Sequence, residues 1–186
     1  HSANKNLKVL TGHTYFCRFF NHPTDGMLVC HFTRTRDNQV SFAPLKDVRI
    51  DSEGTLRLGW WKGNEKMKHD RIKVEKPNDM SKPIAMLGNS FDVRGGTVLE
   101  GDLRLPNNKD RPRGGLYIEC VKNQGAAVLV DHAGVAALGS MPADGTVLTV
   151  KDGKRNLKRV DREMTFTNPS RFRLLLRGSL MEFYLE

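Results

Sequence analysis

The stretch Phe172–Leu185 reads FRLLLRGSLMEFYL and decides the fold class of this chain. Two apolar runs flank the turn sequence Arg177-Gly178-Ser179, so the stretch predicts two antiparallel strands folded back on each other. A terminal strand needs neighbours that pair with it and cover it. Because the sequence stops one residue later, we expect it to be a segment of a longer protein, with only a share of that protein's function.

The same pattern extends over most of the 186 residues. Short apolar runs recur between Gly, Pro, Asn and Asp residues, which is typical of an all-β protein. Four strands in the first half predict one antiparallel meander that resembles a single β-propeller blade. These strands are Thr14–Phe20, Met27–Phe32, Gln39–Ile50 and Thr55–Trp61.

The second half predicts an antiparallel β-sandwich of the jelly-roll or concanavalin-like type, because its strands are short, closely spaced and separated by turn residues. Helix competes with strand only at Ala126–Met141, where the Val128–Val130 run and the Asp131–Gly134 turn favour a hairpin. The expected strands are Ser90–Val93, Thr97–Leu105, Gly115–Val121, Ala126–Asp131, Val135–Met141, Thr146–Val150, Glu163–Thr167, Phe172–Arg177 and Leu180–Leu185.

These patterns divide the chain into a meander at 1–61, a linker or edge segment at 62–85 and a sandwich at 86–186. The middle segment is polar, carries Pro77 and Pro83, and has little hydrophobic periodicity. A short helical turn is expected within it, around Asn64–His69.

The net charge of +9 raises the question of nucleic-acid binding, because Lys and Arg neutralise phosphates. Basic and acidic residues are interleaved throughout, however, and Asp152 and Asp161 dilute the densest basic stretch, Lys151–Arg162. We interpret that stretch as a solvated loop and expect no nucleic-acid partner. We also expect no membrane span, since no apolar run approaches the ~20 residues that a spanning helix needs.

The cysteines and histidines form no metal-binding pattern. Cys17, Cys30 and Cys120 lack the CxxC spacing of structural zinc sites. Buried free thiols are the favoured interpretation, and a bridge between Cys17 and Cys30 stays open, because their strands should be neighbours. His13, His22 and His31 fall near strand ends without a carboxylate to complete a site. We expect neither a metal nor another cofactor.

Several motifs of the chain are similar to the C-terminal region of family 32 glycoside hydrolases, the invertase, levanase and fructanase group. In the sandwich they are Glu100-Gly101-Asp102-Leu103, Gly114–Ile118, Ala127–Asp131 and the closing Arg173–Tyr184 hairpin. In the meander, Gln39–Lys46 and Gly54–Trp61 resemble the last blade of the propeller that precedes this sandwich. Ser179, Glu182 and Phe183 match the family's closing hairpin, whereas Arg177 and Gly178 depart from it.

The resemblance implies a parent that hydrolyses a glycosidic bond with two carboxylates, one attacking the anomeric carbon and one protonating the leaving oxygen. In that family the motifs that carry these groups include Asn-Asp-Pro and Arg-Asp-Pro, which this sequence lacks. Glu119-Cys120 matches a third motif, but Gly114–Ile118 place it on a sandwich strand. We therefore expect no catalytic residue in this chain. By analogy the parent is secreted or periplasmic.

Trp60 and Trp61 are the candidate carbohydrate-binding residues. Neighbouring residues on a strand point to opposite faces, so one indole should be buried while the other faces solvent or an interface. An exposed indole can stack on the apolar face of a sugar ring. Packing between the meander and the sandwich is the alternative role for the pair.

Three functions follow from the sequence. The first is a non-catalytic part of a glycoside hydrolase-like protein, in which the sandwich stabilises the rest of the propeller and contacts carbohydrate. The second is a self-standing, lectin-like sandwich that binds a glycan. The third is an interaction or nucleic-acid module, whose binding would weaken steeply with salt.

Overall fold

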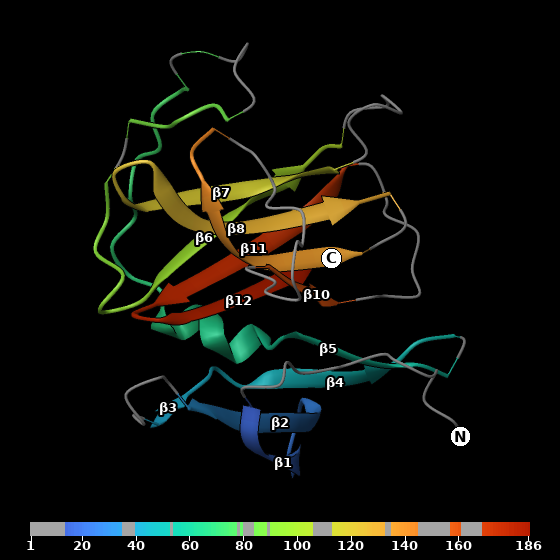
Figure 1. The fold of residues 1–186 in the computed structure, drawn as a ribbon. Helices are drawn as coiled ribbons and strands as arrows, with labels where there is room; N and C mark the ends of the chain where they lie inside the picture. The colour runs from blue at the N-terminus through green and yellow to red at the C-terminus, as the bar shows by residue number, and fades with distance from the viewer. Residues whose placement is uncertain are drawn as a thin grey trace. The chain divides into compact units, whose positions relative to one another are not determined.

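The computed structural model describes residues 14–34, 40–52, 54–77, 79, 84–88, 90–105, 113–132, 135–144, 157–160 and 169–186. Figure 1 shows that the regular secondary structure of these residues is nearly all strand, which confirms the all-β prediction. The described strand registers are all antiparallel. The expected helical turn exists as the 3-10 helix η1 (Lys62–Met67). No helix in the described ranges is long and apolar enough to cross a bilayer.

The strands, in chain order, are β1 (Thr14–His22), β2 (Gly26–Arg34), β3 (Val40–Phe42), β4 (Lys46–Ile50), β5 (Leu56–Trp60), β6 (Thr97–Leu103), β7 (Arg113–Val121), β8 (Gln124–Asp131), β9 (Ala136–Pro142), β10 (Leu157–Val160), β11 (Ser170–Arg177) and β12 (Leu180–Leu185).

The chain groups into two compact units that do not follow the order of the sequence. The first unit comprises 1–71, 92–100 and 172–186, and the second comprises 72–91 and 101–171. The first therefore holds β1 to β5 and η1 together with the start of β6, most of β11 and all of β12. The division at 1–61, 62–85 and 86–186, and the blade and sandwich architectures, stay predictions.

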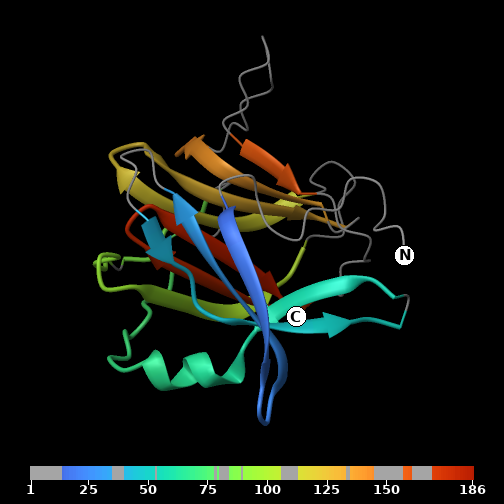
Figure 2. The same cartoon turned by 90° about the horizontal axis from the view of Figure 1, so that it is seen from below.

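The first unit contains a sheet in the order β1-β2-β4-β5, with β3 pairing with β2 beside β4. The single strand expected over Gln39–Ile50 is therefore wrong, because the chain leaves the sheet between β3 and β4. Pro44 has no N–H to donate and interrupts the ladder, while the Ala43 N–H still reaches the His31 carbonyl at 3.1 Å. Figure 2 shows β1 and β2 as one long hairpin of this sheet.

Paired residues of neighbouring strands point to the same face of a sheet, so the register defines two faces. Val29, Lys46 and Trp60 pair across β2, β4 and β5, and all three are buried. We call this side the lysine face. Phe16, Phe32 and Phe42 pair across β1, β2 and β3 on the opposite side, which we call the phenylalanine face.

The closing hairpin forms as predicted. Phe172 pairs with Leu185 and Arg177 with Leu180 across β11 and β12. Gly178 takes a left-handed φ of 54° in the turn, a conformation that costs glycine little. Its N–H donates to the Val93 carbonyl at 2.8 Å. The sheet order β12-β11-β6 gives this hairpin the pairing partner that a terminal strand needs.

The second unit contains a sheet in the order β10-β9-β8-β7. The β8–β9 pair confirms the hairpin expected over Ala126–Met141. The solvated loop expected over Lys151–Arg162 is wrong for its described part, since Leu157–Val160 pairs with β9 as β10. The expected strands Thr146–Val150 and Glu163–Thr167 lie outside the described residues.

The strand expected at Ser90–Val93 is also wrong, because these residues form no strand. They precede a bend at which the Val93 carbonyl accepts the N–H of Gly96 at 3.3 Å. The Val93 carbonyl therefore accepts hydrogen bonds from this local turn and from the closing hairpin, and does not take part in a strand ladder.

Candidate functional site

Trp60 lies inside the first unit and is only 7% exposed. Its indole N–H donates to Glu65 Oε1 at 2.7 Å, and its ring meets the Tyr184 ring edge-on with centroids 5.4 Å apart. The Lys68 ammonium and the Arg173 guanidinium lie 5.4 and 5.8 Å from the ring centroid. The ring of this indole is therefore engaged in packing and cation–π contacts, and its N–H is hydrogen-bonded.

Trp61 directly follows β5, is half-buried and lies beside the β1–β2 turn. Its indole N–H donates to Asp25 Oδ2 at 2.8 Å, and the His22 ring is tilted against it at 5.4 Å. A Cβ added to Gly63 would lie 2.3 Å from the indole ring, so only glycine leaves room for it. Lys62, whose side chain is 78% exposed, holds Asp25 Oδ1 at 2.8 Å.

The Asp25 carboxylate is the centre of this surface cluster. The hydrogen bond from Lys62, supported by the one from Trp61, lowers the pKa of Asp25 from 3.8 to about 2. Both oxygens are already engaged by these two donors. The cluster therefore fastens the β1–β2 turn to the end of β5, and the exposed groups left for a ligand are Lys62 and part of the two aromatic rings.

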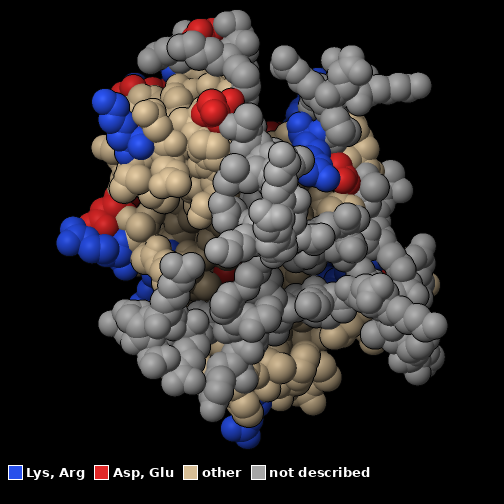
Figure 3. All heavy atoms as spheres, viewed as in Figure 1, with Lys and Arg blue, Asp and Glu red and all other residues tan. Residues whose placement is uncertain are grey.

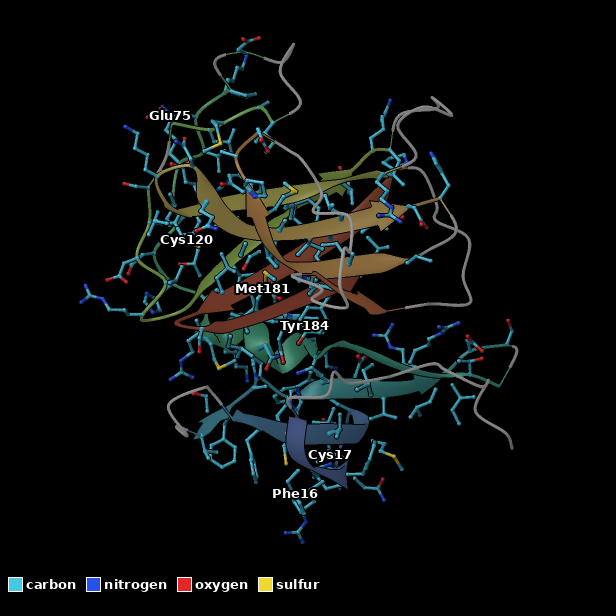
Figure 4. All side chains as sticks on the ribbon, in the orientation of Figure 1. Phe16, Cys17, Glu75, Cys120, Met181 and Tyr184 are labelled. Carbon is cyan, nitrogen blue, oxygen red and sulfur yellow. The ribbon has the colours of Figure 1, made fainter. Side chains whose placement is uncertain are left out.

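A second cluster is buried on the lysine face. The Lys46 ammonium lies 2.9 and 3.0 Å from the two oxygens of Glu182 on β12, 3.2 Å from the Pro44 carbonyl and 2.6 Å from His31 Nε2. Glu182 Oε2 also accepts the Tyr184 hydroxyl at 2.7 Å. Figure 4 labels Tyr184 on β12.

His31 Nε2 lies within hydrogen-bond distance of both the Lys46 ammonium and the Glu182 carboxylate. An ammonium group has three N–H donors and no acceptor, and it meets three partners here: a carboxylate, a carbonyl and an imidazole nitrogen. His31 Nε2 can accept from Lys46, with the ring proton on Nδ1, or carry the proton itself and donate to Glu182 Oε1, which lies 3.1 Å away. This Nδ1 is buried and has no hydrogen-bond partner among the described residues.

Burial and charge oppose each other in this cluster. Burial lowers the pKa of Lys46 even though the nearby Glu182 raises it. Burial would raise the pKa of Glu182, but the contact with His31 and the charge of Lys46 outweigh it and hold that pKa below its usual range. Burial, followed by the charge of Glu182, raises the pKa of Tyr184. The pair is thus a closed, internally neutralised unit with a structural role.

A third set of charges surrounds Trp60. Glu65 and Glu100 each lie 2.8 Å from the same Lys68 ammonium, and Arg173 also binds Glu100. Two carboxylates that share a lysine in this way are held ionised by the cation, which is unsuited to protonating a leaving group. We therefore assign them to the packing around Trp60.

The most unusual surface of the first unit is the phenylalanine face. Phe16 stacks on Phe32 with centroids 5.5 Å apart, and Phe32 meets Phe42 edge-on at 5.4 Å. Phe16 is 52% exposed and Phe42 is 67% exposed. Phe20 and Val40, which are on the same face by strand alternation, are exposed as well. Figure 4 shows Phe16 at the outer side of β1.

Contiguous apolar surface of this kind is uncommon on monomeric proteins and marks an interaction site. The charge distribution agrees with this interpretation. Among the atoms that Figure 3 draws in colour over β1 and β2, uncharged groups predominate, with basic atoms at the margin and no acidic ones. The sequence analysis missed these phenylalanines. Their signal was present, because Phe16 and Phe20 are four residues apart on one predicted strand and therefore lie on the same side of it.

The remaining candidates are not brought together into a site. The three cysteines are free, and Cys17 and Cys120 are exposed, so the buried thiols favoured from the sequence are wrong for these two. Cys17 pairs with His31, one residue from Cys30, so the two thiols point to opposite faces of the sheet. Glu119 and Cys120 lie exposed on β7. Within the described ranges no group of His, Cys, Asp or Glu is arranged to hold a metal ion.

Comparison of the chain with protein families, with curated proteins and with solved structures finds no match. The candidate sites therefore have to be judged from their own geometry. Trp60 and the Lys46–Glu182 cluster are structural, the Trp61–Asp25 cluster is partly open, and the phenylalanine face is open.

The substitution Glu182→Gln tests the buried pair. Removing one partner leaves the Lys46 ammonium buried without a counter-charge, so we expect the free energy of unfolding to fall by about 3 kcal/mol or more in urea denaturation. The matched control is Asp70→Asn, whose side chain is 95% exposed and should change stability by less than about 0.5 kcal/mol. Equal effects of the two variants would show that the pair does not hold the unit together.

The indole N–H of Trp61 should report the titration of Asp25 in NMR spectra. Because the pKa of Asp25 is lowered to about 2, its stabilising charge is present above pH 3.8 and is lost only as the pH falls towards 2. The titration step of the Trp61 signal that reports Asp25 should therefore have its midpoint near pH 2. Lys62→Ala should move the midpoint up towards 3.8, and a wild-type midpoint at or above that value would contradict the assignment.

Proposed function

We propose that this chain is a non-catalytic docking and bracing module, whose phenylalanine face packs against the apolar face of another β-sheet. The observation that carries the proposal is the row of Phe16, Phe32 and Phe42, with its two outer rings more than half exposed. The resemblance noted in the sequence extends the proposal: the partner sheet is the remainder of a propeller in a glycoside hydrolase-like parent.

The chemistry of the described acidic groups supports a non-catalytic role. Glu182 is buried against Lys46, while Asp25 and Glu100 are each held by neighbouring cations. A two-carboxylate hydrolase needs one carboxyl group that stays protonated near neutral pH and a second that remains free to attack. The pKa values of Asp25, Glu100 and Glu182 are all lowered, so none of these groups stays protonated near neutral pH.

The charge of the surface defines the partner. Arg18 lies on the phenylalanine face, because it falls between Phe16 and Phe20 at alternate positions of β1. Arg49, 73% exposed, lies on the same face and forms an ion pair there with Asp47, two residues earlier on β4. A sheet that is apolar at its centre and carries a carboxylate opposite Arg18 would complement this pattern. Covering one phenylalanine ring would contribute about 1–2 kcal/mol.

Phe42→Thr tests the docking proposal when it is made both in this chain and in the longer polypeptide encoded by its gene. Phe42 is exposed in the chain, so the chain's stability should change by less than about 0.5 kcal/mol. In the longer polypeptide the ring is covered, so the loss should reach about 2 kcal/mol in thermal or urea unfolding.

The control for that comparison is Ile50→Thr, at a residue that is 72% exposed on the lysine side of the same sheet. It should have a small effect in both contexts. If no longer polypeptide exists, or if Phe42→Thr is equally mild in both, the docking proposal is wrong.

A second candidate function is carbohydrate contact at the Trp61–Asp25 cluster. The observation that favours it over Trp60 is the partial exposure of Trp61 and His22 beside the extended Lys62 side chain. Two aromatic rings can cover the apolar face of a sugar, and a lysine can donate to its hydroxyls. Trp60 takes no part in this surface, because it is buried.

The two tryptophans provide an internal control for this candidate. On titration with gluco-, fructo- and xylo-oligosaccharides, the indole N–H signal of Trp61 should shift in a saturable manner while that of Trp60 stays fixed. Trp61→Ala should abolish binding, and Trp61→Phe should retain part of it. Unchanged spectra with every sugar, or equal shifts of both indoles, would remove carbohydrate binding at this cluster.

A further inference from the structure

The free edge of β1 is a second surface, and it goes beyond the proposed function because it concerns the backbone and not a sheet face. β1 is the terminal strand in the order β1-β2-β4-β5, and β2 occupies one of its edges. Among the described strands none pairs with its other edge. Alternate N–H and C=O groups along β1 therefore point away from the sheet.

Edge strands usually carry protection against pairing with other chains, such as proline, inward-pointing charges or a bulge in mid-strand. The centre of β1 has no proline, no inward-pointing charge and no bulge, and its one charged residue is the exposed Arg18. Its register with β2 is continuous from Phe16 to His22, and the irregularity lies at its start, next to Thr14. The five residues Phe16–Phe20, FCRFF, are all exposed. Such an edge is suited to strand addition, in which an extended segment of a partner continues the sheet.

The side chains of β1 specify what that segment should contain. Phe16, Arg18 and Phe20 project to one side at alternate positions, with Arg18 in the middle. Arg18 forms no ion pair with the described part of the chain. Across an added strand, facing Cβ atoms lie about 5 Å apart, so opposite charges and apolar pairs stabilise the addition. The complementary segment is an acidic residue flanked two positions away on each side by apolar residues.

We propose that the free edge of β1 binds an extended peptide segment of the pattern apolar-x-acidic-x-apolar by β-strand addition, with the acidic residue opposite Arg18. The backbone supplies the affinity and Arg18 supplies the register. On the other side of the strand, Cys17 and Phe19 accept small or apolar residues of the same segment. The partner is thus a protein segment in extended conformation.

Fluorescence anisotropy with the full chain and labelled synthetic peptides tests the inference. The reference peptide has Val-Thr-Glu-Thr-Val at its centre, and a second peptide has Lys in place of Glu. We expect saturable binding of the Glu peptide and at least about tenfold weaker binding of the Lys peptide. Arg18→Glu, at an exposed position where little else should change, should reverse this preference.

Two N-methylated forms of the Glu peptide separate strand addition from adhesion to the phenylalanine face. A strand presents alternate residues to each edge, so methylating one alternate set of amides should abolish binding, while methylating the other set should leave it intact. Phe42→Thr should change peptide affinity by less than about threefold, since Phe42 is on β3. These outcomes are independent of the test of the docking proposal.

The inference is overturned if the Glu peptide does not bind, if both methylated peptides bind equally well, or if Arg18→Glu leaves the charge preference unchanged.

Discussion

Lys46 is a buried ammonium group, and the first unit is organised around the need to compensate it. Removing a charge from water costs several kcal/mol unless a counter-charge and hydrogen bonds replace the solvent. Glu182 is the only described carboxylate that contacts it, and it lies 136 residues further along the chain. Tyr184, two residues on, closes the same face by meeting Trp60. The position of β12 is therefore tied to β4 and β5 by chemistry that tolerates little displacement.

The two faces of this sheet contrast sharply. On the lysine face the buried polar and aromatic groups around Lys46 have partners among the described residues, apart from one imidazole nitrogen of His31. On the phenylalanine face, rings of comparable size remain in contact with water. The lysine face holds a closed, buried cluster, whereas the opposite face exposes aromatic rings and β1 has a free apolar edge. Exposed surfaces of this kind are typical of a sheet that a partner covers. Both proposals rest on this asymmetry.

Much of the fold could be predicted from local patterns, because strand alternation and turn residues act over a few positions. The Phe172–Leu185 hairpin and the β8–β9 hairpin are examples. The break between β3 and β4 is also predictable from the sequence, because Pro44 cannot donate to a strand ladder. In contrast, no local pattern could pair Lys46 with Glu182, since both residues look like ordinary charged positions on strands. Strand alternation predicts that Trp60 and Trp61 lie on opposite faces. Their partners, Glu65 and Asp25, lie in a helix and in a turn, and the sequence does not predict how these elements pack.

The long separation of Lys46 and Glu182 also has a consequence for synthesis. At about 5–20 residues per second, a ribosome needs roughly 10 s to pass from β4 to β12. During that interval the nascent meander carries a lysine without its carboxylate, together with exposed phenylalanines on β1 and β3. Such a species is prone to aggregate. A chaperone that binds apolar strands would protect the emerging chain until the Phe172–Leu185 hairpin has left the ribosome.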